Sequence, residues 1–223
     1  MPTDRTPMRA LAIIPLIAAL AWAGTSAVRS GLADSAVRDA TDALNAPMTR
    51  IEYRALLADV QSAESLDPSD PAVSELLGIL SSRIDRAEYA DETAVHFRKA
   101  IELRTTSPYA WANLAALDYQ MGRTDDEFRI ALMRASELGP GEPELQRTVA
   151  DYGLAVWNEV DSPLRDAIEG TVARGMTSQP REMLQIAERR GRLAVACRHA
   201  VVGTPRQSDT KWLQLCQSTE ATS

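Results

Sequence analysis

The segment PYAWANLAALDYQMGRTDDEFRIALMRASELGP, residues 108–140, contains the pattern that decides the fold. It begins with a proline, steps from bulky Leu114 to small Ala115, and ends at a second proline. Proline suits the first position of a helix because an N–H there would have no partner inside the helix. The bulky residue fills the space between two helices, and the small one lets the second helix approach closely. The segment therefore predicts a helical hairpin.

The same pattern occurs three times along the chain. The helix-starting pairs, spaced 37 and 35 residues apart, are Asp70-Pro71, Ser107-Pro108 and Glu142-Pro143. The bulky-then-small pairs that follow them are Leu77-Gly78, Leu114-Ala115 and Val149-Ala150. A regular period of this length is typical of helical-repeat proteins. We expect an all-α fold with about three stacked helix pairs over residues 49–160, where residues 49–66 form the second helix of a degenerate unit.

On these residues the chain resembles the tetratricopeptide repeat (TPR) family. The matching positions of the best unit are Trp111, Leu114, Ala115, Gly122, Ala135, Leu138 and Pro140. The resemblance covers roughly residues 49–175 and implies an α-α superhelix. Residues 139–165, with GPGEPELQ and GLAVW, also resemble VpsP-like proteins, which are membrane-anchored repeat proteins encoded with bacterial exopolysaccharide machinery.

The resemblance implies a binding surface. In this family the first helix of each pair lines a concave groove that holds a peptide or a protein segment. The positions that would project into the groove are Glu75, Ile79, Tyr109, Ala112, Ala116, Tyr119, Arg147 and Asp151. The lysine and asparagine set with which some members clamp a C-terminal carboxylate is absent. Alternatively, the chain's own helix over residues 28–44 fills the groove.

The N-terminal segment is apolar on every side. Residues 10–24 form a strictly apolar run that extends to Val28, about 22 to 28 Å as a helix. Such a run behind Arg5 and Arg9 predicts a membrane anchor or the apolar part of a signal peptide. We expect a cytoplasmic segment 1–9, a transmembrane helix 10–28 and a juxtamembrane helix 29–48. The bulk of the chain would then face the periplasm of a bacterial inner membrane, although Arg29 and Arg38 weaken that orientation.

Residues 161–223 are expected to form a helical cap over the last repeat. Helical patterns start at Pro163 and at Pro180, the second running to about residue 201. Cys197 and Cys216 are a candidate disulfide in an oxidising periplasm, or else two separate buried thiols. This segment is rich in arginine, at positions 181, 189, 190, 192, 198 and 206. These arginines either pair with Glu182 and Glu188 or contact an acidic partner or anionic lipid.

No residue set in the sequence supports a reaction. Ser208 and Lys211 match the S-x-x-K pattern of penicillin-recognising serine enzymes, but the K-T-G and S-D-N companions are missing. A net charge of −7 disfavours nucleic-acid binding. We expect no catalytic residues, metal or cofactor, and a membrane-tethered scaffold that binds a protein. The alternatives are a structural subunit held in a larger complex by its transmembrane helix, and a small serine hydrolase.

Overall fold

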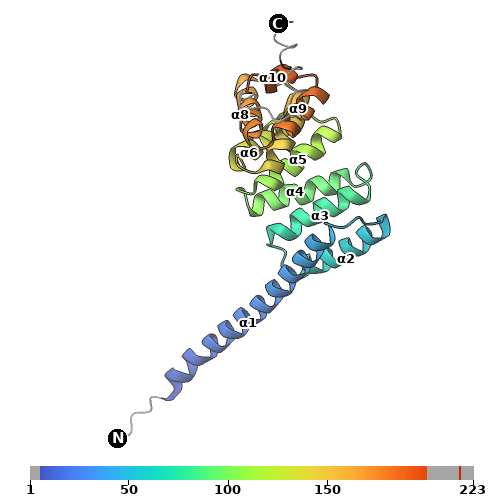
Figure 1. Cartoon of the computed structure of the whole chain (residues 1–223). Coiled ribbons are helices and arrows are strands. Elements are labelled where there is room, and N and C mark those ends of the chain that lie inside the picture. The colour runs from blue at the N-terminus through green and yellow to red at the C-terminus, as the bar shows by residue number, and fades with distance from the viewer. Residues whose placement is uncertain (1–5, 200–215, 217–223) are drawn as a thin grey trace. The chain divides into compact units, whose positions relative to one another are not determined.

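The computed structural model describes the backbone of residues 6–199 and 216, and the side chains from Ala19 onward with the same gap. In this described part all regular secondary structure is helical and no strand occurs, which confirms the predicted all-α class (Figure 1). The chain divides into two compact units, Met1–His96 and Phe97–Ser223, and each is considered by itself. The boundary falls within helix α4 (Ala90–Leu103).

Unit 1 contains three further helices, α1 (Thr6–Ala43), α2 (Arg50–Leu66) and α3 (Pro71–Ile84). The start of α2 is fixed by a capping box in which the Thr49 hydroxyl accepts from the Glu52 N–H and the Glu52 carboxylate accepts from the Thr49 N–H. The start of α3 is fixed by Asp70, whose carboxylate accepts from the Ala72 N–H at 2.8 Å, with Pro71 in the first turn. These local signals explain why helices begin at the predicted residues.

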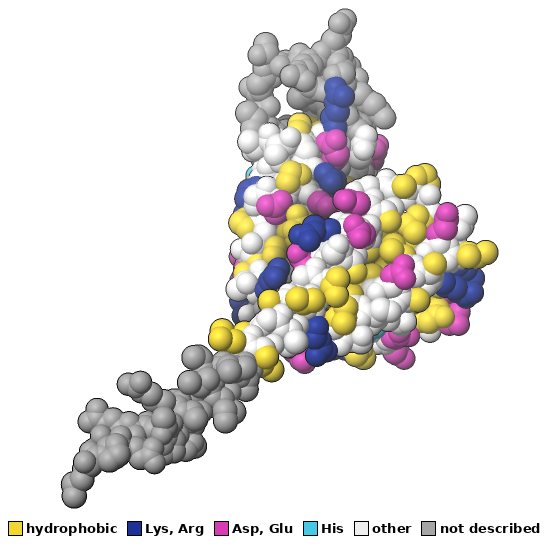
Figure 2. Space-filling model, turned by 90° about the horizontal axis from the view of Figure 1, so that it is seen from below, with side chains coloured by type: hydrophobic (Ala, Val, Ile, Leu, Met, Phe, Trp, Pro, Cys, Tyr) yellow, Lys and Arg dark blue, Asp and Glu magenta, His cyan; other side chains and the backbone are white. Residues whose placement is uncertain are grey.

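The last turns of α1 form the core of unit 1 with α2 and α3. The fully buried members are Ala33, Ala40, Val60, Ala63, Val73, Leu76, Leu77 and Leu80. N-terminal to this core, the described large apolar side chains of α1 are exposed: Leu20 is 64% and Trp22 74% exposed. Figure 2 shows yellow apolar side chains at the surface where the undescribed residues of α1 end.

From Ala19 onward, where side chains are described, no helix combines the length and apolarity that a membrane crossing requires. Residues 10–18, the first part of the predicted transmembrane helix, lie outside that stretch. The helix itself continues without a break from Thr6 to Ala43, so residues 29–43 are helical as expected.

Unit 2 contains the remaining helices. Their bounds are α5 (Pro108–Gln120), α6 (Asp126–Leu138), α7 (Pro143–Ala155), α8 (Ser162–Ser178), α9 (Pro180–Arg189) and α10 (Leu193–Cys197). α5 packs on α6, α7 on α8, and α9 on α10, so the helices form successive hairpins. The first helices α5, α7 and α9 are neighbours in that order, as are the second helices α6, α8 and α10.

Small residues permit the close helix contacts of unit 2. A Cβ at Gly153 of α7 would lie 2.5 Å from Ile168 Cγ1 of α8, and a Cβ at Gly175 would lie 2.5 Å from Met183 Sδ of α9. The second helix of the pair that starts at Pro143 is therefore α8. It lies within residues 161–223, so the helix pairs extend past the boundary expected at 160.

The helix that starts at Pro180 is shorter than expected. It ends at Arg189 because Gly191 adopts a φ of 64°, and the Arg192 N–H then bonds to the Ala187 carbonyl at 2.7 Å. The helix predicted to run to about residue 201 is therefore interrupted at this turn. In α10, Val195 and Ala196 are buried, whereas Ala194 is exposed.

Candidate partner-binding face of unit 2

The predicted groove residues fall on both units. Glu75 and Ile79 lie on α3 of unit 1, where both are half-buried. α1 packs on the same helix. In unit 2, Ala112 is only 3% exposed because it packs inside the unit, so a partner could not reach its side chain. Ala116 is half-buried, and the Tyr109 hydroxyl lies 3.3 Å from the Glu142 carboxylate.

Three of the predicted residues lie on α5 and α7 next to α9: half-buried Tyr119 and Asp151, and exposed Arg147. We call the side of unit 2 formed by α5, α7 and α9 the first-helix face. A hollow of about 290 Å³ lies on it between α7 and α9. Its lining consists of Arg147, Thr148, Asp151, Tyr152, Glu182, Gln185, Ile186 and Arg189. Of the predicted groove residues, Arg147 and Asp151 line this hollow, and the four lining residues of α9 were not among the predicted positions.

Asp151 is held on this face by hydrogen bonds from two arginines. Its Oδ1 accepts from Arg189 and from Arg190 Nε, each at 2.8 Å, and its Oδ2 accepts from Arg190 Nη2 at 3.0 Å. Burial alone would raise the pKa of this carboxyl, but the hydrogen bonds and charges of Arg190 and Arg189 hold the pKa below its ordinary value. The Asp151 carboxyl is therefore ionised, and both of its oxygens already accept hydrogen bonds from residues of the same chain.

Aromatic rings extend the face from α7 to α5. The Tyr119 ring lies 5.0 Å from the Tyr152 ring and 6.4 Å from the Phe128 ring, centroid to centroid. The Gln120 side chain donates to the Tyr152 hydroxyl at 2.7 Å. Arg190 stacks over the Tyr119 ring at 5.4 Å. Arg190, which follows α9 directly, thus reaches across α7 to α5.

Arg147 is held by a buried amide network. Its Nη1 donates to the Gln179 side chain at 2.7 Å. Gln179 in turn donates to the Pro143 carbonyl at 2.7 Å and to the Gln146 side chain at 3.2 Å. These bonds fix one terminal nitrogen of the Arg147 guanidinium, Nη1, at the α8–α9 junction, while the residue itself stays exposed at the hollow.

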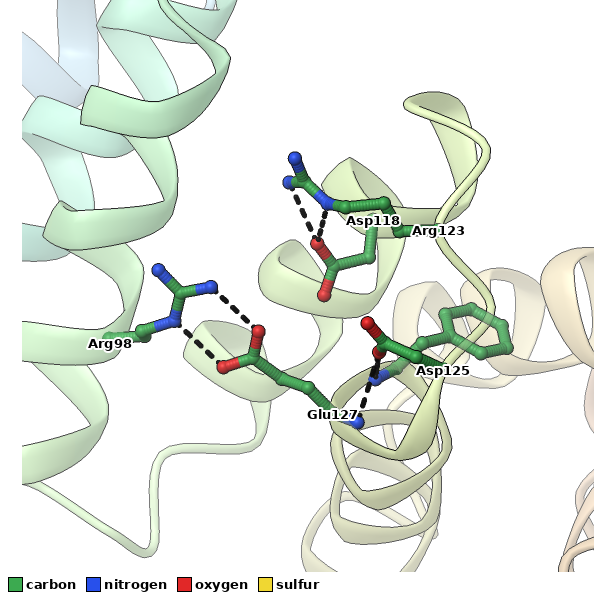
Figure 3. A network of polar contacts seen from close by, with 6 residues as sticks. Arg98, Asp118, Arg123, Asp125 and Glu127 are labelled. Carbon is green, nitrogen blue, oxygen red and sulfur yellow. Dashed lines mark hydrogen bonds and ion pairs between the residues drawn. The ribbon is translucent and has the colours of Figure 1, made fainter.

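A second polar cluster of unit 2 surrounds the turn between α5 and α6 (Figure 3). Arg98 of α4 and Glu127 of α6 form a bidentate ion pair with N–O distances of 2.7 and 2.6 Å. Asp125 caps α6 by accepting from the Glu127 and Phe128 N–H groups. The side chains in Figure 3 point toward one another rather than into a hollow, which indicates a structural tie between helices.

Asp118 is the buried member of this cluster, with 1% of its surface exposed. Its Oδ1 accepts from Arg123 Nε at 2.9 Å, but Oδ2 has no hydrogen-bond partner among the described residues. Burial raises the pKa of the Asp118 carboxyl, and Arg123 opposes that shift. A carboxyl of this kind stabilises the fold better when it is protonated.

The C-terminal part of unit 2 differs in its pairing from the sequence-based expectation. Arg189 and Arg190 bind Asp151, and Arg198 and His199 bind Glu169, rather than Glu182 and Glu188. Cys197 and Cys216 form a disulfide with a Cα–Cα distance of 5.4 Å. Ser208, Lys211 and Arg206 lie outside the described residues. Among the residues that are described, no three His, Cys, Asp or Glu side chains are grouped as metal ligands would be.

Comparison with protein-family models and with curated proteins gives no match for this chain.

Proposed function

We propose that this chain is a membrane-tethered TPR scaffold of the bacterial inner membrane that faces the periplasm and binds a protein partner. The partner would bind the first-helix face of unit 2, in a polysaccharide biosynthesis or export system. The observation that carries the proposal is the hollow between α7 and α9, which exposes guanidinium, carboxylate, hydroxyl and apolar groups side by side. Mixed lining of this kind is typical of protein recognition surfaces.

The anchor is supported by the character of α1. The described residues from Ala19 to Leu32 are exposed, and they include Leu20, Trp22 and Val28. Large apolar side chains on the surface of one helix are stabilised when lipid covers them. Residues 10–18 continue the same apolar sequence toward the N-terminus. A tether of this kind would raise the effective concentration of the partner near the membrane without any chemical step.

Site-specific photo-crosslinking in cells tests the binding proposal. A photoreactive amino acid at Thr148, inside the hollow, should capture a protein, and the same amino acid at exposed Thr177 of α8 should not. Thr177 is the matched control because it replaces the same residue type on the same unit. Equal capture from both positions, or capture from neither, would contradict the proposal.

Two substitutions separate the adaptor from the other candidate functions. Replacing residues 10–28 with an unrelated apolar helix should preserve a tethered adaptor, whereas a structural subunit that packs through this helix should lose function. Ser208→Ala should leave an adaptor fully active and would abolish a serine hydrolase. Loss of function in either variant, with the protein still at its normal level in the membrane, would favour the corresponding alternative.

A further inference from the structure

We infer that the hollow between α7 and α9 binds an acidic segment of the partner protein, with a partner carboxylate held between Arg147 and Arg189. This inference rests on the proposed function, because it specifies the chemistry of the partner at the same face. The two arginines come from different walls of the hollow, Arg147 from α7 and Arg189 from α9.

The hydrogen-bonding groups of the hollow favour a ligand that accepts hydrogen bonds. In the described part of the chain, Arg147 has one polar contact, to Gln179, and Arg189 has one, to Asp151. A guanidinium carries several N–H donors, so each arginine keeps donors for a ligand. The Tyr152 hydroxyl accepts from Gln120 and keeps its own proton to donate. Donors therefore exceed free acceptors at the centre of the hollow.

The resident carboxylate of the hollow does not compete for these donors. Asp151 is bonded by Arg190 through both oxygens and by Arg189 through one, and the half-buried Arg190 neutralises it. Arg189 remains 58% exposed at its side chain, so it can bind a second carboxylate with its outer N–H groups. Guanidinium groups bind carboxylates through paired, charge-assisted hydrogen bonds.

The size of the hollow favours a side chain over a complete small molecule. A volume of about 290 Å³ lies at the lower end of the range for small-molecule sites, roughly 300 to 1,000 Å³. One glutamate with an apolar neighbour fits such a space, and Ile186 supplies an apolar wall. Besides Asp151, Glu182 is the second carboxylate of the lining, and it lies in the first turn of α9. Its removal should therefore strengthen binding.

Fluorescence anisotropy with the purified full chain tests the inference. The probe is a labelled peptide of alternating glutamate and leucine, and the control peptide has glutamine in place of glutamate. We expect the acidic peptide to bind about tenfold more tightly, and Arg147→Gln and Arg189→Gln each to weaken it about tenfold. Glu182→Gln should strengthen it. Arg134→Gln, which removes an exposed arginine of α6 outside the hollow, should leave it unchanged.

Further variants keep the result decisive. Arg147→Lys retains the charge but loses the planar fork, so its affinity should lie between those of the wild type and Arg147→Gln, and circular dichroism checks that each variant is folded. Equal binding of the two peptides, binding of neither, or equally tight binding of a short single-stranded DNA would overturn the acidic-segment inference. Crosslinking from Thr148 judges the proposed function independently, since it captures a partner of any charge.

Discussion

Arg190 stacks over the Tyr119 ring at 5.4 Å and donates to the Tyr119 hydroxyl at 3.2 Å, although 71 residues separate the two in sequence. The same guanidinium binds both oxygens of Asp151. One side chain thus joins α9 to α7 and to α5. The position of α9, and with it one wall of the hollow, depends on this arginine.

Arg190→Met should lower the free energy of unfolding by about 2 kcal/mol, because it removes charge-assisted hydrogen bonds and a cation–π contact in a partly buried setting. Denaturant titration of the full chain followed by far-UV circular dichroism measures the change. The control is Arg198→Met, which removes an exposed ion pair with Glu169 and should cost less than about 1 kcal/mol. Equal effects of the two substitutions would show that Arg190 does not fix α9.

The contribution of Asp151 to stability should depend on pH. Its arginine partners lower the pKa in the folded state, so the ionised form stabilises the fold at pH values above the ordinary aspartate pKa of about 3.9. This stabilisation is lost as the pH falls through the lowered pKa. The difference in unfolding free energy between the wild type and Asp151→Asn should therefore shrink on acidification. A difference that stays constant between neutral and acidic pH would exclude this role.

Asp118 should show the opposite pH dependence. Burial raises the pKa of its carboxyl, so the folded state binds a proton more tightly than the unfolded state does. As the pH falls through the raised pKa toward the ordinary value of about 3.9, the wild type should gain stability relative to Asp118→Asn. The same denaturant titrations test this. A relative loss of wild-type stability over that range would mean that Arg123 outweighs the burial.

Much of the fold could be predicted from local signals. Pro71, Pro108 and Pro143 all occupy the first turn of a helix, as the spacing predicted. A fourth repeat could also have been predicted to start at Pro180, because Pro180 follows Pro143 by 37 residues, the same spacing as between Pro71 and Pro108. The bulky-then-small pair is also present after Pro180, where Ile186-Ala187 lies six and seven residues after the proline, as in the earlier units. Extending the period would have included α9 and the second half of the hollow.

The site was harder to predict because it depends on contacts distant in sequence. Arg147 and Asp151 follow from their helical position, but their partners Gln179, Arg189 and Arg190 come from residues more than 30 positions away. Ala112 shows the reverse limit. The family pattern placed Ala112 on the side of its helix that faces the groove. The neighbouring helices decide whether a small side chain there is covered, and Ala112 is buried.

The disulfide should stabilise the C-terminal end of unit 2. Cys197 and Cys216 close a loop with a sequence separation of 19 residues, and loop entropy alone gives roughly 3 kcal/mol. Reductant should lower the melting temperature of the wild type and leave the double variant Cys197→Ala/Cys216→Ala unchanged. Maleimide labelling of the denatured chain is the direct check. Labelling without reductant would show that the two thiols are free.

Gly153 should be the most sensitive small residue of the α7–α8 contact. A Cβ there would lie 2.5, 2.8 and 3.0 Å from three carbons of Ile168, so Gly153→Ala should cost about 1 to 3 kcal/mol by overpacking. All three atoms belong to one side chain, and Ile168→Ala in the same chain should recover part of that loss. Gly170→Ala is the control, because it lies in helix α8 with only the flexible end of Arg174 at 3.4 Å, and it should stabilise by up to about 1 kcal/mol through helix propensity. If Gly153→Ala were as well tolerated as Gly170→Ala, the close approach of α7 and α8 would not be a packing requirement.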